Sequence, residues 1–452
     1  MNLHELGLEL DALPRPLVYM CFSTSIIHGG HIAILKKAQQ LGTLVVGVLS
    51  DEAIASCKYY PIVPFEERKK LFENLNGIYR VVEQDTWSYR DVICQLKPDF
   101  IVHGDDWQQG FQQPLRVEVL ELLAQPGTPG KLIEFPYSHD EKYAELDNFF
   151  LRQSALPDMR RAKLRKLLAL KPCLTAIEVH NGITGLIAEQ TKVFSEEPNQ
   201  PKTIAQFDAM WVSSLCDSTA KGKPDIELVD MTSRFNTITE ITEVTTKPII
   251  FDGDTGGLNE HFVYTVRSLE RMGVSMVIIE DKVGLKKNSL FGTEVKQEQD
   301  SIEHFCDKIR AGKKAQRTRD FMICARIESL ILEQGVDDAL ARAQAYVAAG
   351  ADAIMIHARK HDPAELFEFT DRFRELNHQT PLVAVPTAYS QVTEQELQQH
   401  GINIVIYANH LMRAGIPAMQ QAAASILKHH RALEAEPLCM PFRDIITMIP
   451  EE

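Results

Sequence analysis

The chain has 452 residues, of which 44% are hydrophobic, and its formal net charge is −14 at pH 7. This length exceeds that of one average domain and predicts two domains, one small and one large. The negative charge argues against a nucleic-acid partner, because binding to phosphate backbones needs clustered basic surface.

Cysteine usage and the N-terminal sequence bear on the compartment. The eight cysteines are scattered, with no pair at metal-ligand spacing and no compact disulfide framework. Residues 1–16 carry acids where a signal peptide needs a basic start and an apolar core. No apolar run approaches the length of a membrane-spanning helix, which is about 20 residues. We therefore expect a cytoplasmic protein with free thiols and no membrane partner.

Short apolar runs alternate with helical segments in the first third of the chain. This spacing predicts parallel strands with crossover helices, and hence a small doubly wound, Rossmann-like α/β domain. We place the domain at 16–137, after an N-terminal extension over 1–15. The predicted strands are 17–22, 43–50, 99–104 and 131–136.

Two histidines, His28 and His31, follow the first predicted strand and open a helix. Being three residues apart, they face the same way at a helix N-terminus, which attracts phosphate. The pattern is weak by itself and gains weight from its position after the strand.

Charged helical sequence occupies 138–172. Leu164, Leu167 and Leu168 share one face there among basic residues. We interpret the segment as a connecting helix whose basic residues form a solvated face rather than an anion site.

From 173 onward, eight strand-like runs alternate with helical segments such as 261–273 and 337–350. This alternation predicts an eight-stranded β/α barrel over 173–435, followed by a C-terminal tail over 436–452. The predicted strands are 174–180, 209–215, 247–254, 275–281, 321–328, 351–358, 381–387 and 402–409.

Polar residues gather where these runs end. In a β/α barrel the C-terminal strand ends and the loops after them carry the chemistry, so these residues are candidates for a site. They are Asp252, Asp254, Glu280, Asp281, Arg326, Glu328, His357, Asn409 and His410.

Three of these carboxylates, on Asp252, Asp254 and Glu280, are expected to converge on one rim. Hard oxygen ligands without histidine or cysteine favour Mg²⁺ or Mn²⁺. The alternative is that two of them cap helices or pair with Arg326. We favour the metal, because three acids at adjacent strand ends would otherwise repel one another.

Arg326 and His357 are predicted to point into the same mouth. A guanidinium holds a carboxylate or phosphoryl group at two points, and a histidine donates to a developing oxyanion. The alternative for His357 is a satisfied core histidine. The loop over 280–289 adds three lysines, an amide and a hydroxyl, which suit an anionic substrate near a metal, whereas a solvated surface loop is the other interpretation.

Five segments of the second domain resemble the phosphoenolpyruvate mutase family of the isocitrate lyase superfamily. The resemblance spans about 173 to 435 and rests on EDKVGLKKNS (280–289), FDGDTGG (251–257), WVSSL (211–215), ARIES (325–329) and IMIHARK (354–360). It implies that Asp252 binds Mg²⁺ directly and that Asp254 and Glu280 reach the metal through water.

The resemblance also assigns roles around the substrate. Trp211, Ser213, Ser214 and Leu215 align with the pocket for its carboxylate end. Asp225 aligns with an essential aspartate on a mobile segment. A gating loop contains Lys286, Asn288 and Ser289, and the phosphoryl group is held by Arg326, His357 and Asn288.

One substitution separates this chain from the carbon–carbon lyases of the superfamily. Those enzymes carry a cysteine followed by Gly-His in the gating loop, and this chain has Lys286-Lys287-Asn288-Ser289. The resemblance therefore implies a mutase that interconverts phosphoenolpyruvate and phosphonopyruvate, as a homo-oligomer formed through the barrel. A phosphonopyruvate hydrolase remains the alternative, since it shares the metal site and most of the pocket.

The first domain resembles the cytidylyltransferase family over about 16 to 136. The resemblance implies CTP as co-substrate, with His28 and His31 on its bridging phosphates and with Lys58 and Arg68 as further phosphate contacts. The segment 103–107 fits a later loop of that family. Fusions of the two families occur in the biosynthesis of phosphonates, including the antibiotic fosfomycin, and a phosphonate such as 2-hydroxyethylphosphonate would be the acceptor.

Two departures weaken this second activity. Phe22-Ser23-Thr24-Ser25 stands where most members have Gly-x-Phe-Asp, and the segment 138–143 replaces an expected Ile-Ser-Ser-Thr. The latter carries two acids, which would repel a triphosphate. A non-catalytic domain kept for folding or oligomerisation therefore remains the alternative.

Overall fold

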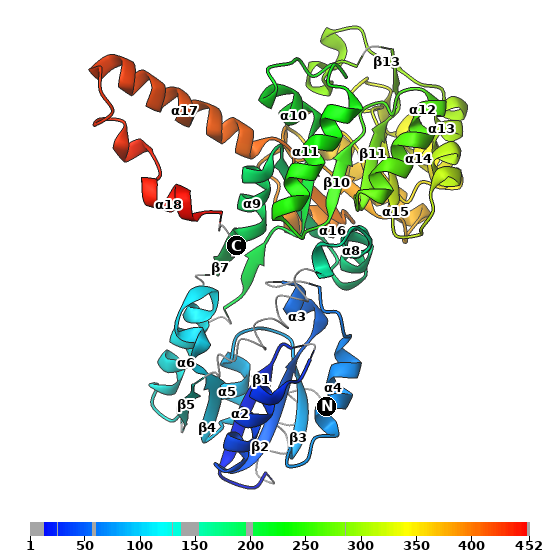
Figure 1. Cartoon of the computed structure of the whole chain (residues 1–452). Coiled ribbons are helices and arrows are strands. Elements are labelled where there is room, and N and C mark those ends of the chain that lie inside the picture. Colours follow the sequence, from blue (N-terminus) through cyan, green and yellow to red (C-terminus); the bar gives the residue numbers. More distant parts are fainter. Residues whose placement is uncertain are drawn as a thin grey trace. The chain divides into compact units, whose positions relative to one another are not determined.

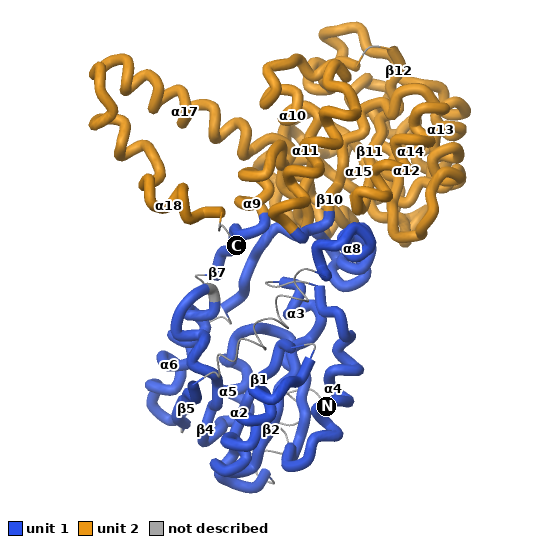
Figure 2. Tube along the Cα trace, in the orientation of Figure 1, with its two compact units in different colours: residues 1–174, 189–208, 246–248 blue, residues 175–188, 209–245, 249–452 orange. Residues whose placement is uncertain are grey.

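The computed structural model describes residues 13–24, 26–56, 60–128, 130–136, 153–195, 202–284 and 286–449. The chain forms two compact units (Figures 1 and 2). Unit 1 comprises 1–174, 189–208 and 246–248, and unit 2 comprises 175–188, 209–245 and 249–452. Lys58 and the segment 138–143 lie outside the described residues.

Unit 1 contains a five-stranded parallel sheet with the order β3-β2-β1-β4-β5, which confirms the predicted doubly wound domain. Its strands are β1 (Leu17–Phe22), β2 (Thr43–Leu49), β3 (Arg80–Gln84), β4 (Phe100–Gly104) and β5 (Lys131–Phe135). The helical segments around the sheet are α2 (Gly29–Gln39), α3 (Asp51–Ala55), α4 (Phe65–Glu73), α5 (Arg90–Leu96), η2 (Asp105–Gln108), η3 (Gly110–Gln112) and α6 (Gln113–Leu123).

Alternation along β1 builds a core on each face of this sheet. Leu17 and Tyr19 belong to one buried cluster, and Val18, Met20 and Phe22 belong to the other. Successive residues of a strand point to opposite faces, so one apolar strand serves both cores. The strand β3 was not predicted, because only Val81 and Val82 of this short edge strand are apolar and buried.

The predicted connecting helix is α8 (Pro157–Leu170), which belongs to unit 1. The expectation of a solvated basic face is wrong for Arg160, Arg161 and Lys163, which are all buried. Lys163 Nζ donates to the carbonyl of Thr246 at 2.6 Å, and burial lowers the pKa of Lys163 to about 7. Periodicity placed the leucines correctly, but it could not reveal that the opposite face is covered as well. A short antiparallel pair, β7 (Lys192–Phe194) and β8 (Ile204–Gln206), completes the regular structure of the unit.

Unit 2 is a closed barrel of parallel strands in the order β10-β11-β14-β15-β16-β17-β6-β9, which confirms the predicted fold (Figure 1). Each predicted run contains one strand, and the central ones are buried along their whole length, as expected for parallel strands covered on both faces. The strands are β6 (Leu174–Val179), β9 (Ala209–Val212), β10 (Ile249–Asp252), β11 (Met276–Glu280), β14 (Met322–Ile327), β15 (Ala353–Ile356), β16 (Leu382–Ala384) and β17 (Ile404–Tyr407).

Helices follow the strands, and all of them except α17 lie around the outside of the barrel (Figure 1). They are α9 (Gly182–Gln190), α10 (Ser214–Ala220), α11 (Met231–Val244), α12 (Asn259–Arg271), α13 (Ile302–Ala315), α14 (Gly335–Ala348), α15 (Ala364–Leu376), α16 (Glu394–Gln399) and α17 (His410–His429). The loop after β11 forms a small pair, β12 (Lys282–Val283) with β13 (Glu298–Gln299), and the 3-10 segment η4 (Ser289–Glu294). No helix in the described part of the chain is long and apolar enough to span a membrane.

The helix α17 is anchored at its start and extends away from the barrel (Figure 1). The buried carboxylate of Glu178, in β6, accepts hydrogen bonds from the backbone nitrogens of Leu411 at 2.8 Å and Met412 at 3.4 Å. A carboxylate suits a helix N-terminus, where backbone N–H groups lack partners. Beyond this cap no residue of α17 is buried. The segments η5 (Glu436–Leu438) and α18 (Phe442–Thr447) follow it.

Candidate active site

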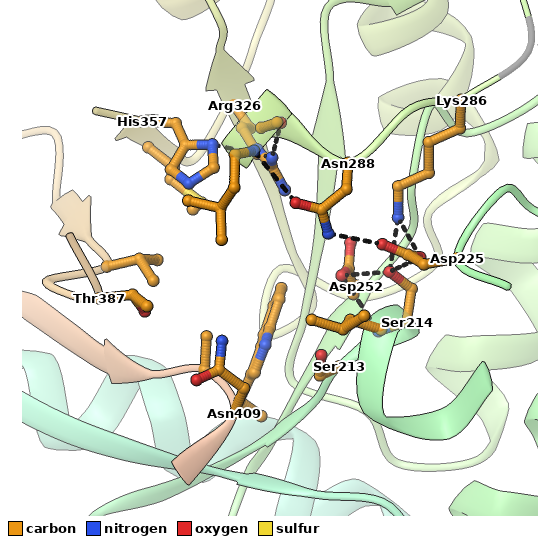
Figure 3. A pocket seen from close by; sticks show the side chains of 17 residues that line it. Ser213, Ser214, Asp225, Asp252, Lys286, Asn288, Arg326, His357, Thr387 and Asn409 are labelled. Atoms are coloured by element: carbon orange, nitrogen blue, oxygen red, sulfur yellow. Dashed lines mark hydrogen bonds and ion pairs between the residues drawn. The ribbon is translucent and has the colours of Figure 1, made fainter. Parts of the chain in front are cut away.

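A cavity of about 70 Å³ lies at the C-terminal ends of the barrel strands (Figure 3). Pockets for drug-sized ligands measure roughly 300–1,000 Å³, so this one suits a small metabolite. The predicted residues that line it are Trp211, Ser213, Ser214, Leu215, Asp225, Asp252, Lys286, Asn288, Ser289, Arg326 and His357.

Sequence reasoning missed several lining residues. Leu290, Met355, Val385 and Ala408 are apolar and carry no signal, whereas Asn409, a candidate at the end of the eighth run, does line the cavity. Thr387 ends the seventh run, so the rule that polar residues at strand ends carry chemistry could have found it.

The ammonium group of Lys286 lies among oxygen atoms. Nζ is 2.6 Å from Ser214 Oγ and 2.9 Å from Asp225 Oδ1, and it also contacts Asp254 Oδ1. Burial alone would lower the pKa of Lys286, but the charges of Asp254, Asp252 and Asp225 raise that pKa above its ordinary value. Lys286 therefore stays protonated and compensates a dense group of carboxylates.

Asn288 and Ser289 continue the same loop over the cavity. Asn288 Nδ2 donates to Asp225 Oδ2 at 3.0 Å, and Asn288 Oδ1 accepts from the nitrogen of Leu290 at 3.0 Å, which caps η4. Ser289 Oγ donates to Glu328 Oε2 and accepts from Arg326 Nη2, both at 2.6 Å. The loop is thus tied to Asp225 through Asn288 and to the end of β14 through Ser289, and Lys286 and Ser289 are buried.

Arg326, Glu328 and His357 form a second network. Arg326 Nε donates to Glu328 Oε1 at 2.5 Å, and His357 Nδ1 lies 2.8 Å from Arg326 Nη2 and 2.9 Å from Glu328 Oε1. Burial would raise the pKa of Glu328, but Arg326 and His357 hold it well below its usual range. Burial and the charge of Arg326 lower the pKa of His357. At neutral pH this corner therefore presents a charged guanidinium beside a neutral imidazole.

Arg234, on α11, fixes Asp252 at the end of β10 and Asp254 just after it. Its Nη1 donates to the carbonyl of Asp252 at 2.6 Å and to Asp254 Oδ2 at 2.9 Å, and its Nε lies 3.6 Å from Asp217 Oδ2. Asp254 has a left-handed backbone with φ of 54°, an uncommon state for a non-glycine residue. Arg234 belongs to no motif that we recognised, and its position in a helix gave no signal.

The carboxylates predicted to bind a metal are held by cations. Asp252 Oδ2 accepts from Ser214 Oγ at 2.7 Å, and although burial opposes it, the charges of Lys286, Arg326 and Arg234 lower the pKa of Asp252 to about 2. The oxygens of Glu280 lie 3.2 Å from Lys282 Nζ and 3.1 Å from Arg326 Nη2, and burial raises its pKa to about 7. The alternative pairing with Arg326 therefore holds for Glu280.

The carboxylate oxygens of Asp252, Asp254 and Glu280 are the kind of ligand that Mg²⁺ prefers. Neither oxygen of Glu280 accepts a hydrogen bond from the described residues, so both keep lone pairs for a further partner. Nevertheless, no group of three or more His, Cys, Asp or Glu side chains in that part of the chain is arranged to hold a metal ion. The metal site at Asp252, Asp254 and Glu280 remains a prediction.

Asp281 and His410 do not line the cavity. Asp281 is bound by Tyr346 Oη at 2.8 Å and Arg342 Nη1 at 3.2 Å, and burial raises its pKa to about 7. His410 begins α17. Their place at strand ends makes them candidates, but the contacts of Asp281 are structural and His410 lies outside the cavity.

In unit 1, His28 and His31 open α2 as predicted. His28 Nδ1 accepts from the nitrogen of Gly30 at 3.2 Å, and His31 Nδ1 accepts from the nitrogen of His28 at 3.4 Å. The ring centroids are 3.8 Å apart. Because each Nδ1 accepts, each neutral ring carries its proton on Nε2, which makes that atom a donor.

Arg68, also predicted to bind a nucleotide, has its contacts inside unit 1. Arg68 is buried, and its Nη2 pairs with Asp51 Oδ1 at 2.6 Å while its Nε donates to the carbonyl of Val63 at 3.0 Å. Much of its charge is therefore used inside the fold, and its contact to phosphate stays a prediction. The predicted later loop, 103–107, spans the end of β4 and the start of η2, and His103 stacks on Trp107 with ring centroids 3.8 Å apart.

Comparison with known proteins decides the family. A family model described as phosphoenolpyruvate phosphomutase matches residues 164–427, more than half of the chain. The chain belongs to the phosphoenolpyruvate phosphomutase family. A second model, described as cytidylyltransferase-like, matches residues 23–126. The protein is therefore an enzyme of an isomerase family with a cytidylyltransferase-like domain ahead of the barrel.

Three known proteins show how far the similarity goes. A phosphoenolpyruvate phosphomutase of Tetrahymena pyriformis is 32% identical over 65% of this chain and 92% of its own length. A phosphonopyruvate hydrolase of Variovorax is 34% identical over 64% of this chain and 94% of its own. A solved phosphonopyruvate hydrolase in complex with oxalate and Mg²⁺ has a TM-score of 0.56 and 32% identity, covering 64% of this chain and 94% of its own. Identity alone therefore does not separate mutase from hydrolase.

Proposed function

We propose that the barrel interconverts phosphoenolpyruvate and 3-phosphonopyruvate, so that a phosphoryl group moves between oxygen and carbon. The observation that carries the proposal is the loop over 286–289, whose Lys286, Asn288 and Ser289 all line the cavity. Lys286 and Asn288 are bonded to Asp225, in the segment between α10 and α11, and Ser289 is bonded to Arg326 in β14. The loop holds lysine and asparagine where the carbon–carbon lyases have a catalytic cysteine, and so it offers positioning and charge instead.

Magnesium fits this chemistry. Asp252 would hold the ion directly, with Asp254 and Glu280 reaching it through water, and the solved hydrolase relative was crystallised with Mg²⁺. When bound, the ion supplies positive charge that stabilises a pyruvate enolate. Arg234 keeps Asp252 and Asp254 in place through its hydrogen bonds at 2.6 and 2.9 Å.

The phosphoryl group would be held by Arg326, His357 and Asn288. A transferring phosphoryl group resembles metaphosphate and needs positioning and charge more than covalent help. The guanidinium of Arg326 supplies the charge, and Asn288, on the closing loop beside it, supplies an amide donor (Figure 3).

Exclusion of water is what separates a mutase from a hydrolase. A metaphosphate-like group that met water would become free phosphate, so the loop must stay closed while the enolate turns its carbon toward phosphorus. The cavity of about 70 Å³ beneath buried Lys286 and Ser289 supports this closed arrangement.

Phosphorus NMR of the full-length protein with phosphonopyruvate and Mg²⁺ tests the proposal. We expect the phosphonate resonance to be replaced by that of phosphoenolpyruvate. Free phosphate together with pyruvate would instead assign the protein as a phosphonopyruvate hydrolase.

For unit 1 we propose CTP-dependent cytidylylation of a phosphonate such as 2-hydroxyethylphosphonate. The specific support is the histidine pair, whose Nε2 protons can be donated to phosphate oxygens at the start of α2. The full-length protein should release pyrophosphate when given CTP, Mg²⁺ and a phosphonate. If several phosphonates give no pyrophosphate while the barrel is active, unit 1 is a non-catalytic domain.

We also infer that the barrel forms homo-oligomers through α17. Leu427 is 75% exposed and Met419 is 65% exposed on a helix with no buried residue. Large exposed apolar surfaces mark interfaces, and a second copy brings a matching face in a closed pair. Light scattering should show a dimer or larger assembly. Leu427→Glu should dissociate this assembly, whereas Gln421→Glu, at a nearby exposed position, should leave it intact. A monomeric wild-type protein would contradict the inference.

A further inference from the structure

The hydroxyl of Thr387 stands out among the polar groups of the cavity. Thr387 follows β16 and lines the cavity, and its Oγ1 is buried without a hydrogen-bond partner among the described residues. Most buried polar groups in proteins have a partner, so an orphan at a ligand cavity points to a ligand.

The other hydroxyls of the cavity are used within the protein. Ser213 Oγ accepts from the nitrogen of Cys216 at 3.3 Å. Ser214 Oγ bonds Asp252, Asp225 and Lys286, and Ser289 Oγ bonds Arg326 and Glu328. These serines are held by the folded chain before substrate arrives, whereas Thr387 keeps both its donor and its acceptor capacity.

Thr387 also lies on the uncharged side of the cavity. Figure 3 shows Thr387 and Asn409 apart from Asp225, Asp252 and Lys286, and on the same side of the cavity as His357. Asn409 Oδ1 accepts from Arg413 Nη1 at 3.4 Å, and its amide nitrogen points toward the cavity in Figure 3. The ends of β16 and β17 therefore bring two neutral donors to one wall.

We propose that Thr387, supported by Asn409, binds the phosphoryl end of the substrate in the barrel; this rests on the proposed function. In the proposed reaction Arg326 and His357 hold the phosphoryl group, and Thr387 lies on the same side of the cavity as His357 (Figure 3). Three phosphoryl oxygens need donors from more than one direction, and Arg326 and Asn288 cover only part of them. The Thr387 hydroxyl donates a hydrogen bond to one of these oxygens, and the neutral wall adds no repulsion.

Removal of the hydroxyl without change of shape tests the assignment. In the full-length protein with Mg²⁺, Thr387→Val should lower kcat/KM for phosphonopyruvate at least about 10-fold, and Thr387→Ser should restore most of it. The inhibition constant of oxalate, which carries two carboxylates and no phosphoryl group, should change less than about 2-fold. As a matched control, Thr239→Val removes a hydroxyl that bonds the carbonyl of Phe235 in its own helix and should leave kcat/KM unchanged.

Two results would overturn the assignment. Full kcat/KM in Thr387→Val would show that the hydroxyl does not touch substrate. An equal loss of oxalate affinity would place its role at the carboxylate end or in the fold. The melting temperature provides the check on folding, because loss of an unpartnered buried hydroxyl should not lower it. Consumption of phosphonopyruvate is measured whichever product forms, so failure of the mutase proposal is seen separately as release of phosphate.

Discussion

The cavity of the barrel and the histidine pair of unit 1 are organised in opposite ways. In the barrel, charged side chains hold one another: Lys286 contacts Ser214, Asp225 and Asp254, and Arg326 contacts Glu328, Ser289 and His357. At the start of α2, His28 and His31 are oriented by backbone N–H groups. Loss of one side chain from the barrel network should therefore disturb several others. A substitution in the histidine pair should disturb only the start of α2.

Buried lysines show the same contrast. Burial lowers the pKa of Lys163 in unit 1 to about 7. In the barrel, Lys286 is equally buried, yet carboxylates outweigh the burial and raise its pKa. In the active-site network, carboxylates thus offset the free energy of burying a charged lysine. In unit 1 that free energy is largely not offset and lowers the stability of the fold.

Asn288→Ala gives the largest expected effect. It removes the donor to Asp225 and the cap of η4, so the closing loop loses its hold and turnover should fall at least about 100-fold with the fold intact. Asn288→Asp keeps a capping oxygen but places a negative charge against Asp225, and it should be as inactive. As a control, the Phe291→Ala variant should stay active, because the neighbouring Phe291 is exposed. Near wild-type turnover of Asn288→Ala would refute the assigned role.

Arg234→Met should destabilise the barrel, although Arg234 does not line the cavity. It leaves the buried carboxylates of Asp217 and Asp254 with one cation fewer, which costs about 3–5 kcal/mol. Hydrogen exchange should accelerate in peptides from unit 2 and not in those from unit 1. The exposed pair of Arg372 with Asp337 provides the control, since Arg372→Ala should leave exchange unchanged. Equal exchange in wild type and Arg234→Met would show that the network is not cooperative.

His28→Ala tests whether the histidine pair of unit 1 acts independently of the barrel. Loss of the N-cap should cost about 1 kcal/mol, and pyrophosphate release should be lost while turnover by the barrel is unchanged. His28→Asn retains a capping oxygen and should restore the stability but not the activity. If His28→Asn released pyrophosphate as fast as wild type, the histidine would be a cap and no more.

The pH dependence of unit 1 should report Lys163. Its pKa is lowered in the folded state to about 7, so below pH 7 the penalty is fully present. Between pH 7 and the unfolded pKa the unfolded chain binds more protons, and stability should rise by up to about 1.4 kcal/mol per pH unit. Lys163→Met should flatten the rise when unfolding of unit 1 is followed by hydrogen exchange. A slope that survives in Lys163→Met would assign it to other groups such as Lys247, whose pKa burial also lowers.

Sequence patterns predicted both folds because each barrel strand is an apolar run and parallel strands are buried on both faces. The short edge strand β3 escaped because Val81 and Val82 are its only buried apolar residues. Residues in recognisable motifs, such as Asp252 and Asn288, were found. Arg234, which meets Asp254 only through the fold, and buried Arg160 and Lys163 were not, because burial of a charged residue depends on what packs over it.

Incorporation of ¹⁸O from labelled water tests the central claim that the closed loop keeps water from the transferring phosphoryl group. The full-length protein is incubated with phosphonopyruvate and Mg²⁺ in ¹⁸O-labelled water, and the phosphorus products are analysed by NMR and mass spectrometry. A water-excluding mutase should give phosphoenolpyruvate without ¹⁸O in its phosphoryl group. Phosphate carrying one ¹⁸O, formed together with pyruvate, would contradict the account.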